Sequence, residues 1–347
     1  MNTPAISTPP VGAEVAARVY RGAVQEAIHY ASIAVVDRTG RLTHYLGDPD
    51  IIMMTRSSIK PFQLTPLVMT GAADHFKFTN EQLAIMAGSH SGTEDHVRVI
   101  LSNLAQAGNK AEHLKCGCHV PIWMQNDGVF PRAGEEKDPT RHNCSGKHTN
   151  FLALARFMGV EPGHYLDPES NSQRLVKKII SEVCEYPEEK MKVGVDGCSA
   201  PNFPLPLRNL AVGYSKLARP FRCAQQIGSA LDRIRTAMSE FPVMVSGEKR
   251  LDMVIMQSFP GRAISKGGGE AIQGIGFVEP HIGIAIKVHD GSFRPLGAIC
   301  LEIFRQLGLV AKIEDFPYLM QYDRPEVRNN SDLVTGHVVT EFELKKA

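Results

Sequence analysis

The sequence predicts an α+β fold, because β-rich segments lie near both ends of the chain and helices fill the region between them. The first β-rich segment spans residues 31–47 and contains the turn sequence Asp37–Gly40, which is typical of a hairpin. The second spans residues 262–292. Strands do not alternate with helices along the chain, so a parallel sheet of βαβ units is not expected.

The length and composition set the size of the folded unit. The chain has 347 residues, of which 43% are hydrophobic, enough for a large buried core. Residues 1–13 are rich in Pro, Thr and Ala and are expected to form a flexible tail. We predict that residues 14–347 form a single catalytic unit. Its sheet would come from both chain ends, and its helical portion would span roughly residues 70–240.

Helix signals recur through the central region. Residues 57–71 fit a strand or loop that leads into a helix, with Pro61 in the first turn, where proline is tolerated. Thr79 and Gln82 have the spacing of a capping box. Residues 116–139 are irregular and are interpreted as a functional loop, and residues 191–206 as a strand that enters a proline-rich turn. Further helices are expected at residues 94–108, 146–159, 170–186, 207–218, 223–241 and 294–309.

Charge and cysteine content argue against several classes of protein. The net charge is +1, from 38 basic and 37 acidic residues, so no basic excess is available to bind nucleic acid. No apolar run approaches the roughly twenty residues that span a bilayer, so no membrane partner is expected. The N-terminal residues lack the pattern of a signal peptide. Seven cysteines are an odd number, which favours a reducing cytoplasm over a disulfide framework.

The segment Ser57–Lys60 has the spacing S-x-x-K, which can place a hydroxyl beside an amine. Residues three apart share one face of a helix. A buried lysine near another cation, here Arg56, can be neutral near pH 7 and can take the proton of a serine, which makes the serine a nucleophile. The alternative is an ordinary helix start, with Ser57 as the cap and Lys60 in solvent.

Two later segments extend this pattern. Penicillin-recognising serine enzymes follow S-x-x-K with a serine-containing turn and then with a lysine and small residues on a late strand. Residues 88–92 (GSHSG) supply Ser89 and Ser91, and residues 265–270 (SKGGGE) supply Lys266. Taken separately, the first segment also fits a helix C-cap and the second a flexible loop. The three segments in this order favour a serine hydrolase.

Residues 142–148 (HNCSGKH) and Cys198 offer ligands for a metal ion. Cys144 and Cys198 could hold Zn²⁺ if a third ligand is present. From the residues alone, a histidine of this segment is preferred over Lys147, because a lysine must lose its proton before it binds metal. A cysteine at a helix N-terminus has a lowered pKa, so a thiol nucleophile is an open alternative. A pair of inert buried cysteines is another.

The segment Cys116–His119 (CGCH) resembles a metal hook but has no partner pair, so loop packing is the preferred interpretation. The sequence leaves the roles of Cys116, Cys118, His142 and His148 open.

Together these motifs resemble the L-asparaginase II family. The resemblance rests on residues 56–63 (RSSIKPFQ), 88–92, 142–148 and 195–201 (VDGCSAP), and it extends from about Val19 to the final helix. SKGGGE is the loosest motif. The resemblance implies a fold like that of serine β-lactamases, penicillin-binding proteins and glutaminases, with an antiparallel sheet flanked by helices and a helical subdomain. It also implies a homodimer that hydrolyses L-asparagine to L-aspartate and ammonia.

The resemblance assigns catalytic roles to two Ser–Lys pairs. Ser57 matches the nucleophile and Lys60 its base, while Ser89 and Lys266 match a second pair. Two alternatives stay open: a β-lactamase-like or glutaminase-like serine amidohydrolase, and a zinc-stabilised binding protein without catalysis.

The resemblance also assigns the residues around the catalytic pairs. Cys144, Lys147 and Cys198 match the ligands of a Zn²⁺ ion whose fourth ligand is water, so the resemblance replaces the expected histidine with a lysine. It does not say whether that lysine is modified. The remaining matches are to polar residues of the substrate pocket. Asp196 would receive the α-ammonium group of the substrate, and Asn143 or Arg56 would receive its carboxylate.

Overall fold

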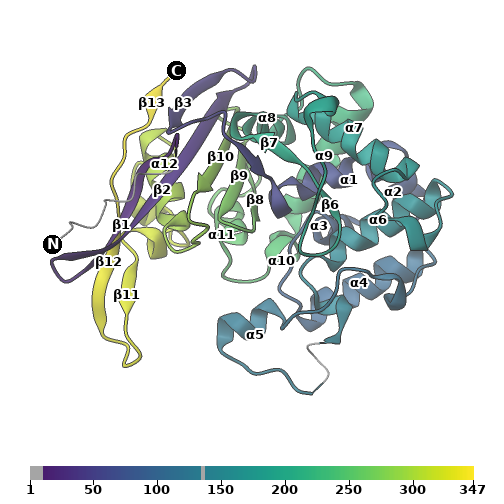
Figure 1. Cartoon of the computed structure of the whole chain (residues 1–347), viewed down its shortest axis with the longest axis horizontal. Helices are drawn as coiled ribbons and strands as arrows, with labels where there is room; N and C mark the ends of the chain where they lie inside the picture. Colours follow the sequence, from purple (N-terminus) through teal and green to yellow (C-terminus); the bar gives the residue numbers. More distant parts are fainter. Residues whose placement is uncertain (1–10, 134–136) are drawn as a thin grey trace, which may run out of the picture.

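The computed structural model describes residues 11–133 and 137–347, which form a sheet region on one side and a helical region on the other (Figure 1). Most of the predicted tail, residues 1–13, therefore lies outside the described residues. Gly12 is within them, and its carbonyl oxygen accepts a hydrogen bond from Ser32 Oγ at 3.1 Å. The chain therefore already contacts the folded body of the protein at Gly12.

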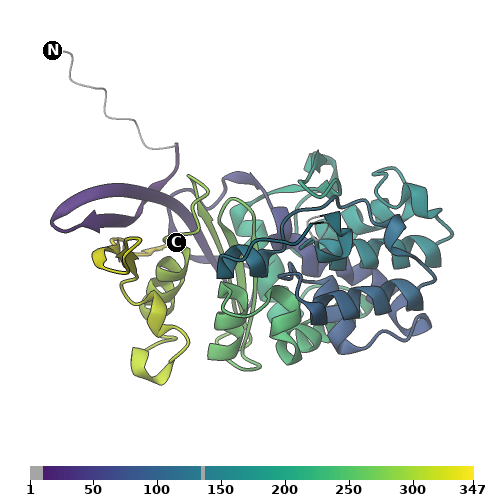
Figure 2. The ribbon, with the colours of Figure 1, turned by 90° about the horizontal axis from the view of Figure 1, so that it is seen from below.

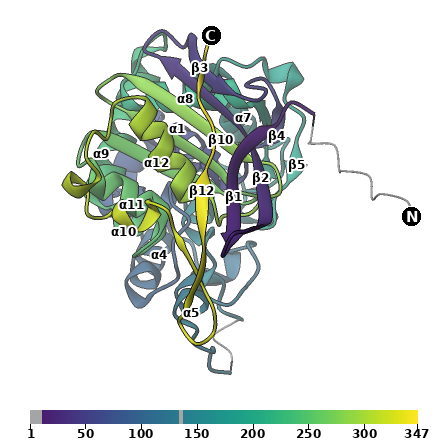
Figure 3. The same ribbon diagram turned by 90° about the vertical axis from the view of Figure 1, so that its left-hand side faces the viewer.

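The main sheet has nine strands and every pairing in it is antiparallel, which confirms the predicted α+β class. Its strands are β1 (Glu14–Arg21), β2 (Val24–Asp37), β3 (Leu42–Leu46), β8 (Ala263–Gly268), β9 (Ile272–Phe277), β10 (Ile282–Val288), β11 (Glu326–Arg328), β12 (Val334–Thr340) and β13 (Lys345–Lys346). The strand order is β11-β12-β1-β2-β10-β9-β8, with β3 paired to β2 and β13 paired to β3. Strands from both ends of the chain therefore lie side by side (Figure 3).

Helices cover both faces of the sheet. Along β2, Ile33 and Val35 belong to a core shared with α11 (Leu251–Ser258) and α12 (Leu296–Gln306). Ala34 and Val36 point to the opposite face and join the core that includes α8 (Leu207–Ala218). Because both faces are covered, all six residues of β9 are buried.

Glycines let α8 approach the sheet closely. A Cβ atom on Gly274 would lie 1.9 Å from the ring of Tyr214, and one on Gly283 would lie 2.0 Å from the carbonyl oxygen of Ala211. A side chain at either position would push the helix away from the sheet. The glycines of these strands are therefore required by packing.

The helical region is built around α1 (Lys60–Met69), which packs against α2, α3, α6, α7 and α9. Lys60–Val68 are all buried, which is the pattern of a helix enclosed on every side. The remaining helices are α2 (Ala72–His75), α3 (Asn80–Met86), α4 (Glu94–Gln106), α5 (Ile122–Asp127), α6 (Ser145–Phe157), α7 (Asn171–Cys184), α9 (Gln225–Glu240) and α10 (Pro242–Ser246). Figure 2 shows this region extending away from the sheet.

The predicted helix starts are confirmed. Pro61 lies in the first turn of α1. The capping box forms at α3, where the Thr79 backbone N–H donates to Gln82 Oε1 at 2.9 Å and the Gln82 N–H donates to Thr79 Oγ1 at 3.4 Å. Ser170 caps α7 by accepting a hydrogen bond from a backbone N–H.

Several regions differ from the predictions. The predicted loop at residues 116–139 contains α5. The predicted strand at residues 191–206 is broken into β5 (Gly194–Val195), β6 (Pro201–Asn202) and β7 (Pro204–Pro206), the last paired with β4 (Ile52–Met54), because its prolines cannot donate to a ladder. Strand β1, which precedes the first predicted β segment, and strands β11–β13, which follow the last α-helix, were not predicted. In the described part of the chain, no helix is both long and apolar enough to cross a membrane.

Candidate functional site

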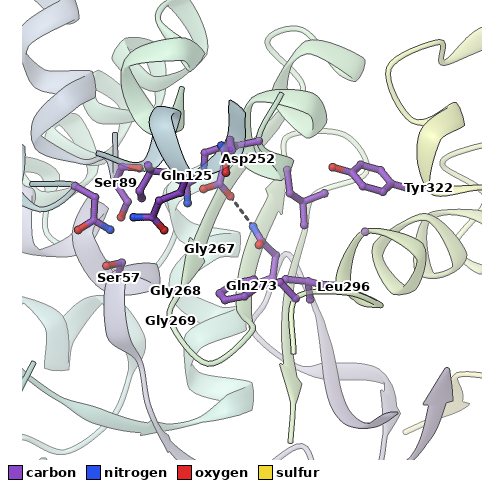
Figure 4. A pocket seen from close by; sticks show the side chains of 17 residues that line it. Ser57, Ser89, Gln125, Asp252, Gly267, Gly268, Gly269, Gln273, Leu296 and Tyr322 are labelled. Atoms are coloured by element: carbon purple, nitrogen blue, oxygen red, sulfur yellow. Dashed lines mark hydrogen bonds between the residues drawn. The ribbon is translucent and has the colours of Figure 1, made fainter. Parts of the chain in front are cut away.

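A cavity of about 580 Å³ lies where the sheet meets the helical region (Figure 4). It is bordered by the 3₁₀ turn Arg56–Ile59, the end of β8, α5 and the start of α11. Three predicted site residues line it: Ser57, Ser89 and Asn143. The other polar side chains of the lining are those of Gln125, Asn126, Arg250, Asp252, Gln273 and Tyr322.

The predicted base, Lys60, makes its side-chain hydrogen bond to a different serine from the expected one. Its Nζ donates to Ser89 Oγ at 2.8 Å and to the carbonyl oxygen of Gly88 at 2.7 Å. Within residues 11–133 and 137–347, no hydrogen bond joins Lys60 to Ser57. Burial lowers the pKa of Lys60. The structure therefore shows an amine with a reduced proton affinity in contact with a serine hydroxyl on the cavity wall.

Ser57 follows a residue with an unusual backbone. Arg56 has φ of +50°, a left-handed conformation that is uncommon for a residue with a side chain. Asn202 stabilises it from both sides, because the Arg56 N–H donates to Asn202 Oδ1 and Asn202 Nδ2 donates to the Arg56 carbonyl oxygen, each at 3.1 Å. Such strained residues persist where the surroundings hold them, often at functional sites. The bend presents Ser57 to the cavity.

The glycines after Lys266 lie directly against this turn. A Cβ atom on Gly268 would lie 3.0 Å from the Thr55 carbonyl oxygen and 3.1 Å from the Ser58 nitrogen. The end of this strand therefore packs directly against the serine turn.

Lys266 lies behind the cavity wall and binds an acid rather than Ser89. Its Nζ donates to Asp252 Oδ2 at 3.3 Å and to the Gly267 carbonyl oxygen at 2.5 Å. Burial lowers the pKa of Lys266 to about 8, although the Asp252 carboxylate opposes the shift. Asp252 Oδ1 accepts two more hydrogen bonds, from Ser265 Oγ at 3.0 Å and from Gln273 Nε2 at 2.7 Å.

Arg56 and Asp196, both predicted to contact substrate, lie outside the lining of the main cavity. Arg56 Nε binds Asp196 Oδ1 at 2.8 Å, and a second ion pair joins Arg56 to Glu270 at 3.8 Å. These residues line a separate cavity of about 390 Å³ together with Lys287. Their geometry supports the strained turn at Arg56 and leaves the guanidinium already paired with carboxylates.

Asn143 is held in place by a histidine of the predicted functional loop. Its backbone N–H donates to His119 Nε2 at 3.1 Å. Because Nε2 accepts, the ring hydrogen is on Nδ1, which donates to the Val120 carbonyl oxygen at 2.7 Å. His119 was assigned to loop packing in the sequence, and it lies next to a residue that lines the cavity.

Cys144, Lys147 and Cys198 come together beneath this wall. Lys147 Nζ lies 2.9 Å from Cys198 Sγ, and the Cys198 thiol donates to the sulfur of Cys144, which lowers the pKa of Cys144. Two sulfur atoms and one nitrogen, with Cys198 in contact with both of the others, suit the ligand preference of Zn²⁺, provided that the amine is neutral. No group of three or more His, Cys, Asp or Glu side chains suited to a metal occurs among the described residues. A metal here would therefore need Lys147 as its third protein ligand.

The residues whose roles the sequence left open have other contacts. Cys116 Sγ donates to the Pro139 carbonyl oxygen at 3.5 Å, and Cys118 Sγ donates to the Lys137 carbonyl oxygen at 3.0 Å. His142 Nδ1 accepts a hydrogen bond from the Cys144 backbone N–H at 3.0 Å, and His148 Nδ1 lies 2.6 Å from a tyrosine hydroxyl. These contacts are consistent with packing and with orientation of the start of α6.

Sequence reasoning missed Arg250 and Asp252, which line the cavity from the start of α11. They stand in the segment "KRLD", which has no recognised spacing to the other motifs. The available signal was a pair of charged residues at the beginning of an otherwise apolar helix.

The family model described as L-asparaginase II matches residues 17–340. No curated protein matches the chain in sequence. A crystal structure of Mglu in its native form is similar at 15% identity, covering 80% of this chain and 61% of that one, with a TM-score of 0.43. A β-lactamase from Mycobacterium bovis is similar at 13% identity, covering 82% and 95%, with a TM-score of 0.40. This chain thus spans less than two thirds of the length of the Mglu chain.

Proposed function

The chain belongs to the L-asparaginase II family, and on that premise we propose that it is a serine amidohydrolase that converts L-asparagine to L-aspartate and ammonia. The observation that carries the proposal is the contact of the buried Lys60 amine with Ser89 Oγ at 2.8 Å, on the wall of a cavity that Ser57 also lines. A buried amine in contact with a hydroxyl is the arrangement that activates serine for acyl transfer.

In this mechanism Ser57 Oγ attacks the side-chain amide carbon of asparagine. Its proton passes to the neutral amine of Lys60, with the Ser89 hydroxyl between them as a relay. The new C–O bond forms an ester, the C–N bond breaks, and the nitrogen leaves as ammonia after it receives a proton. Water then attacks the ester and aspartate is released. The proton held by Lys60 returns to Ser57 Oγ, and a proton from the water restores the group that protonated the leaving nitrogen.

Two further groups support these steps. The backbone N–H of Ser57 is the candidate donor to the developing oxyanion, an interaction worth about 3 kcal/mol in other enzymes. Lys266, held by Asp252, is the proposed source of the proton for the leaving nitrogen, since its pKa of about 8 allows it to give up a proton near neutral pH.

We also propose that Cys144, Lys147 and Cys198 hold Zn²⁺. When bound, the ion would supply Lewis acidity, reduced by its two thiolate ligands. The chain's own contribution is orientation, because Cys144 directly follows Asn143, so fixing its sulfur also fixes the adjacent wall of the cavity.

Ammonia release tests the function. Wild-type protein is expected to release ammonia from L-asparagine faster than from L-glutamine, and to leave a chromogenic β-lactam intact. Preference for glutamine or for the lactam would favour the corresponding alternative amidohydrolase, and no turnover of any of the three would favour a binding protein.

The nucleophile is tested by comparing Ser57→Ala with Ser89→Ala. Ser57→Ala is expected to lower kcat by about 10³-fold or more, as loss of a serine nucleophile does elsewhere, while Ser89→Ala keeps a measurable rate. In wild-type protein quenched during turnover, mass spectrometry should find an aspartyl group on the peptide that contains Ser57. If Ser57→Ala kept substantial activity while Ser89→Ala abolished it, Ser89 would be the nucleophile.

The metal site is tested by elemental analysis of purified protein. Wild type is expected to contain one equivalent of zinc and Cys198→Ala to lose it, because two protein ligands hold zinc much more weakly than three. Cys223→Ala, which changes a half-buried cysteine between α8 and α9 that is not a proposed ligand, is the matched control and should keep its zinc. A full equivalent of zinc in Cys198→Ala would show that the assigned site is wrong.

A further inference from the structure

Among the described residues, Arg250 is the one cationic residue in the lining of the cavity that holds Ser57 and Ser89. Its Nη1 donates to the carbonyl oxygen of Ser89 at 2.6 Å and to that of Ser246 at 3.2 Å. Both acceptors are uncharged. In the described parts of the chain the guanidinium makes no ion pair, and burial lowers its pKa. A desolvated guanidinium without a carboxylate partner provides a binding position for an anion.

The other charged residue of the lining is Asp252. It does not compete with an incoming anion for Arg250, because it makes no ion pair with the guanidinium. Both of its carboxylate oxygens are engaged, by Ser265 and Gln273 on one side and by the Lys266 ammonium on the other. The free charge that faces the cavity is therefore positive.

The arginine expected from the sequence, Arg56, is in a different state. Its guanidinium is paired with Asp196 at 2.8 Å and lines the separate cavity. An incoming carboxylate would have to displace an existing ion pair there, which costs more than binding to an unpaired guanidinium.

We propose that Arg250 binds the α-carboxylate of the substrate, so that the site accepts free α-amino acids with a side-chain amide and discriminates against substrates whose carboxylate is blocked. The inference rests on the proposed function for the identity of the reaction. The placement suits asparagine, because its carboxylate is only three bonds from the amide carbon. Arg250 donates a hydrogen bond to the carbonyl oxygen of Ser89, and the hydroxyl of the same serine contacts Lys60. The guanidinium therefore lies next to the reacting groups.

The test compares L-asparagine with L-aspartic acid diamide, which carries the same side chain but a neutral α-amide. In wild type we expect kcat/KM to fall by about 10- to 150-fold on going to the diamide, the range for loss of a hydrogen bond between charged groups. Arg250→Gln should lose a similar factor on asparagine and almost nothing on the diamide. Arg250→Lys, which keeps the charge without the planar fork, should retain part of the preference.

Lys249→Asn is the matched control. It removes a neighbouring, exposed positive charge that does not line the active cavity, and asparagine tolerates the positive φ of that position. This variant should keep the wild-type preference for asparagine. If Arg250→Gln lost the same factor on both substrates, with Arg250→Lys behaving likewise, Arg250 would be a structural residue and the proposal would be wrong.

Failure of the proposed function can be distinguished from failure of the proposed carboxylate contact. If wild type released no ammonia from asparagine, calorimetry with L-aspartate and with its α-amide, L-isoasparagine, would replace the kinetic assay. If Arg250→Gln bound aspartate more weakly than wild type but bound isoasparagine equally well, the contact with the α-carboxylate would be supported without the reaction. Equal binding of the two ligands by wild type would overturn it.

Discussion

The two buried lysines of the site have different partners, and this gives them different chemistry. Lys60 Nζ contacts neutral oxygen atoms of Gly88 and Ser89, whereas Lys266 Nζ contacts the Asp252 carboxylate. Burial lowers the pKa of both, and a positive charge on Lys60 further disfavours protonation of Lys266. Lys60 is therefore suited to accept a proton and Lys266, with its ion pair, to store and return one.

The lowered pKa of Lys266 predicts that activity falls and stability rises as the pH increases. If its ammonium supplies the proton for the leaving nitrogen, kcat/KM for asparagine should fall as pH rises through about 8. Because the pKa is about 8 in the folded protein but 10.5 in an ordinary lysine, the unfolded chain binds more protons between these values. The contribution of Lys266 to the free energy of unfolding therefore rises with pH across that window.

Parallel measurements of kcat/KM and of the urea midpoint from about pH 6 to 10 would separate the two effects. The arginine of Lys266→Arg stays charged throughout this range. The fall of kcat/KM near pH 8 should therefore disappear in this variant, and its rate should be lower overall. A limb near pH 8 that persisted in Lys266→Arg would assign that ionisation to another group.

At this scale, the sequence identified reactive side chains better than their contacts. Ser57, Lys60 and Ser89 were predicted from short motifs; the two serines line the cavity, and Lys60 contacts Ser89 behind its wall. The pairing of Lys60 with Ser89 depends on how α1 packs against α3, which no local spacing encodes. Arg250 was missed because a single arginine becomes informative only when the cavity around it is known.

Among the elements, the best predicted were those whose ends carry their own signals. The capping box at Thr79 and the cap at Ser170 fix their helices through hydrogen bonds within three residues. The segment at residues 191–206 was predicted poorly, because it forms short strands only through partners elsewhere, such as β4. Helix α5 was missed because it has only six residues and no periodicity to detect.

At the scale of the whole molecule, the site depends on the joining of two regions. Lys266 belongs to the sheet, while Lys60 and Ser89 belong to the helical region, and α11 carries Arg250 and Asp252 between them. The sheet itself is completed from both chain ends, since β12 pairs with β1. Both strands of this pair lie outside the two β segments predicted from the sequence.

Gly336 in β12 tests how much that closure stabilises the protein. A Cβ atom at this position would lie 1.8 Å from the Tyr20 carbonyl oxygen and 2.9 Å from its carbonyl carbon, both rigid backbone atoms of β1. Gly336→Ala must therefore shift β12 away from β1, and we expect the free energy of unfolding to fall by about 1–3 kcal/mol, the usual cost of overpacking. Urea unfolding would measure this.

Gly163→Ala is the matched control for that substitution, because nothing lies within 4 Å of a Cβ atom at Gly163 and its φ is not positive. Its stability should stay within about 0.5 kcal/mol of wild type. Since β12 lies at the opposite side of the sheet from β8, folded Gly336→Ala should retain the wild-type kcat for asparagine. Unchanged stability in Gly336→Ala would mean that β12 does not pair tightly with β1, and a large loss of kcat at full folding would mean that strain at the sheet edge reaches Lys266.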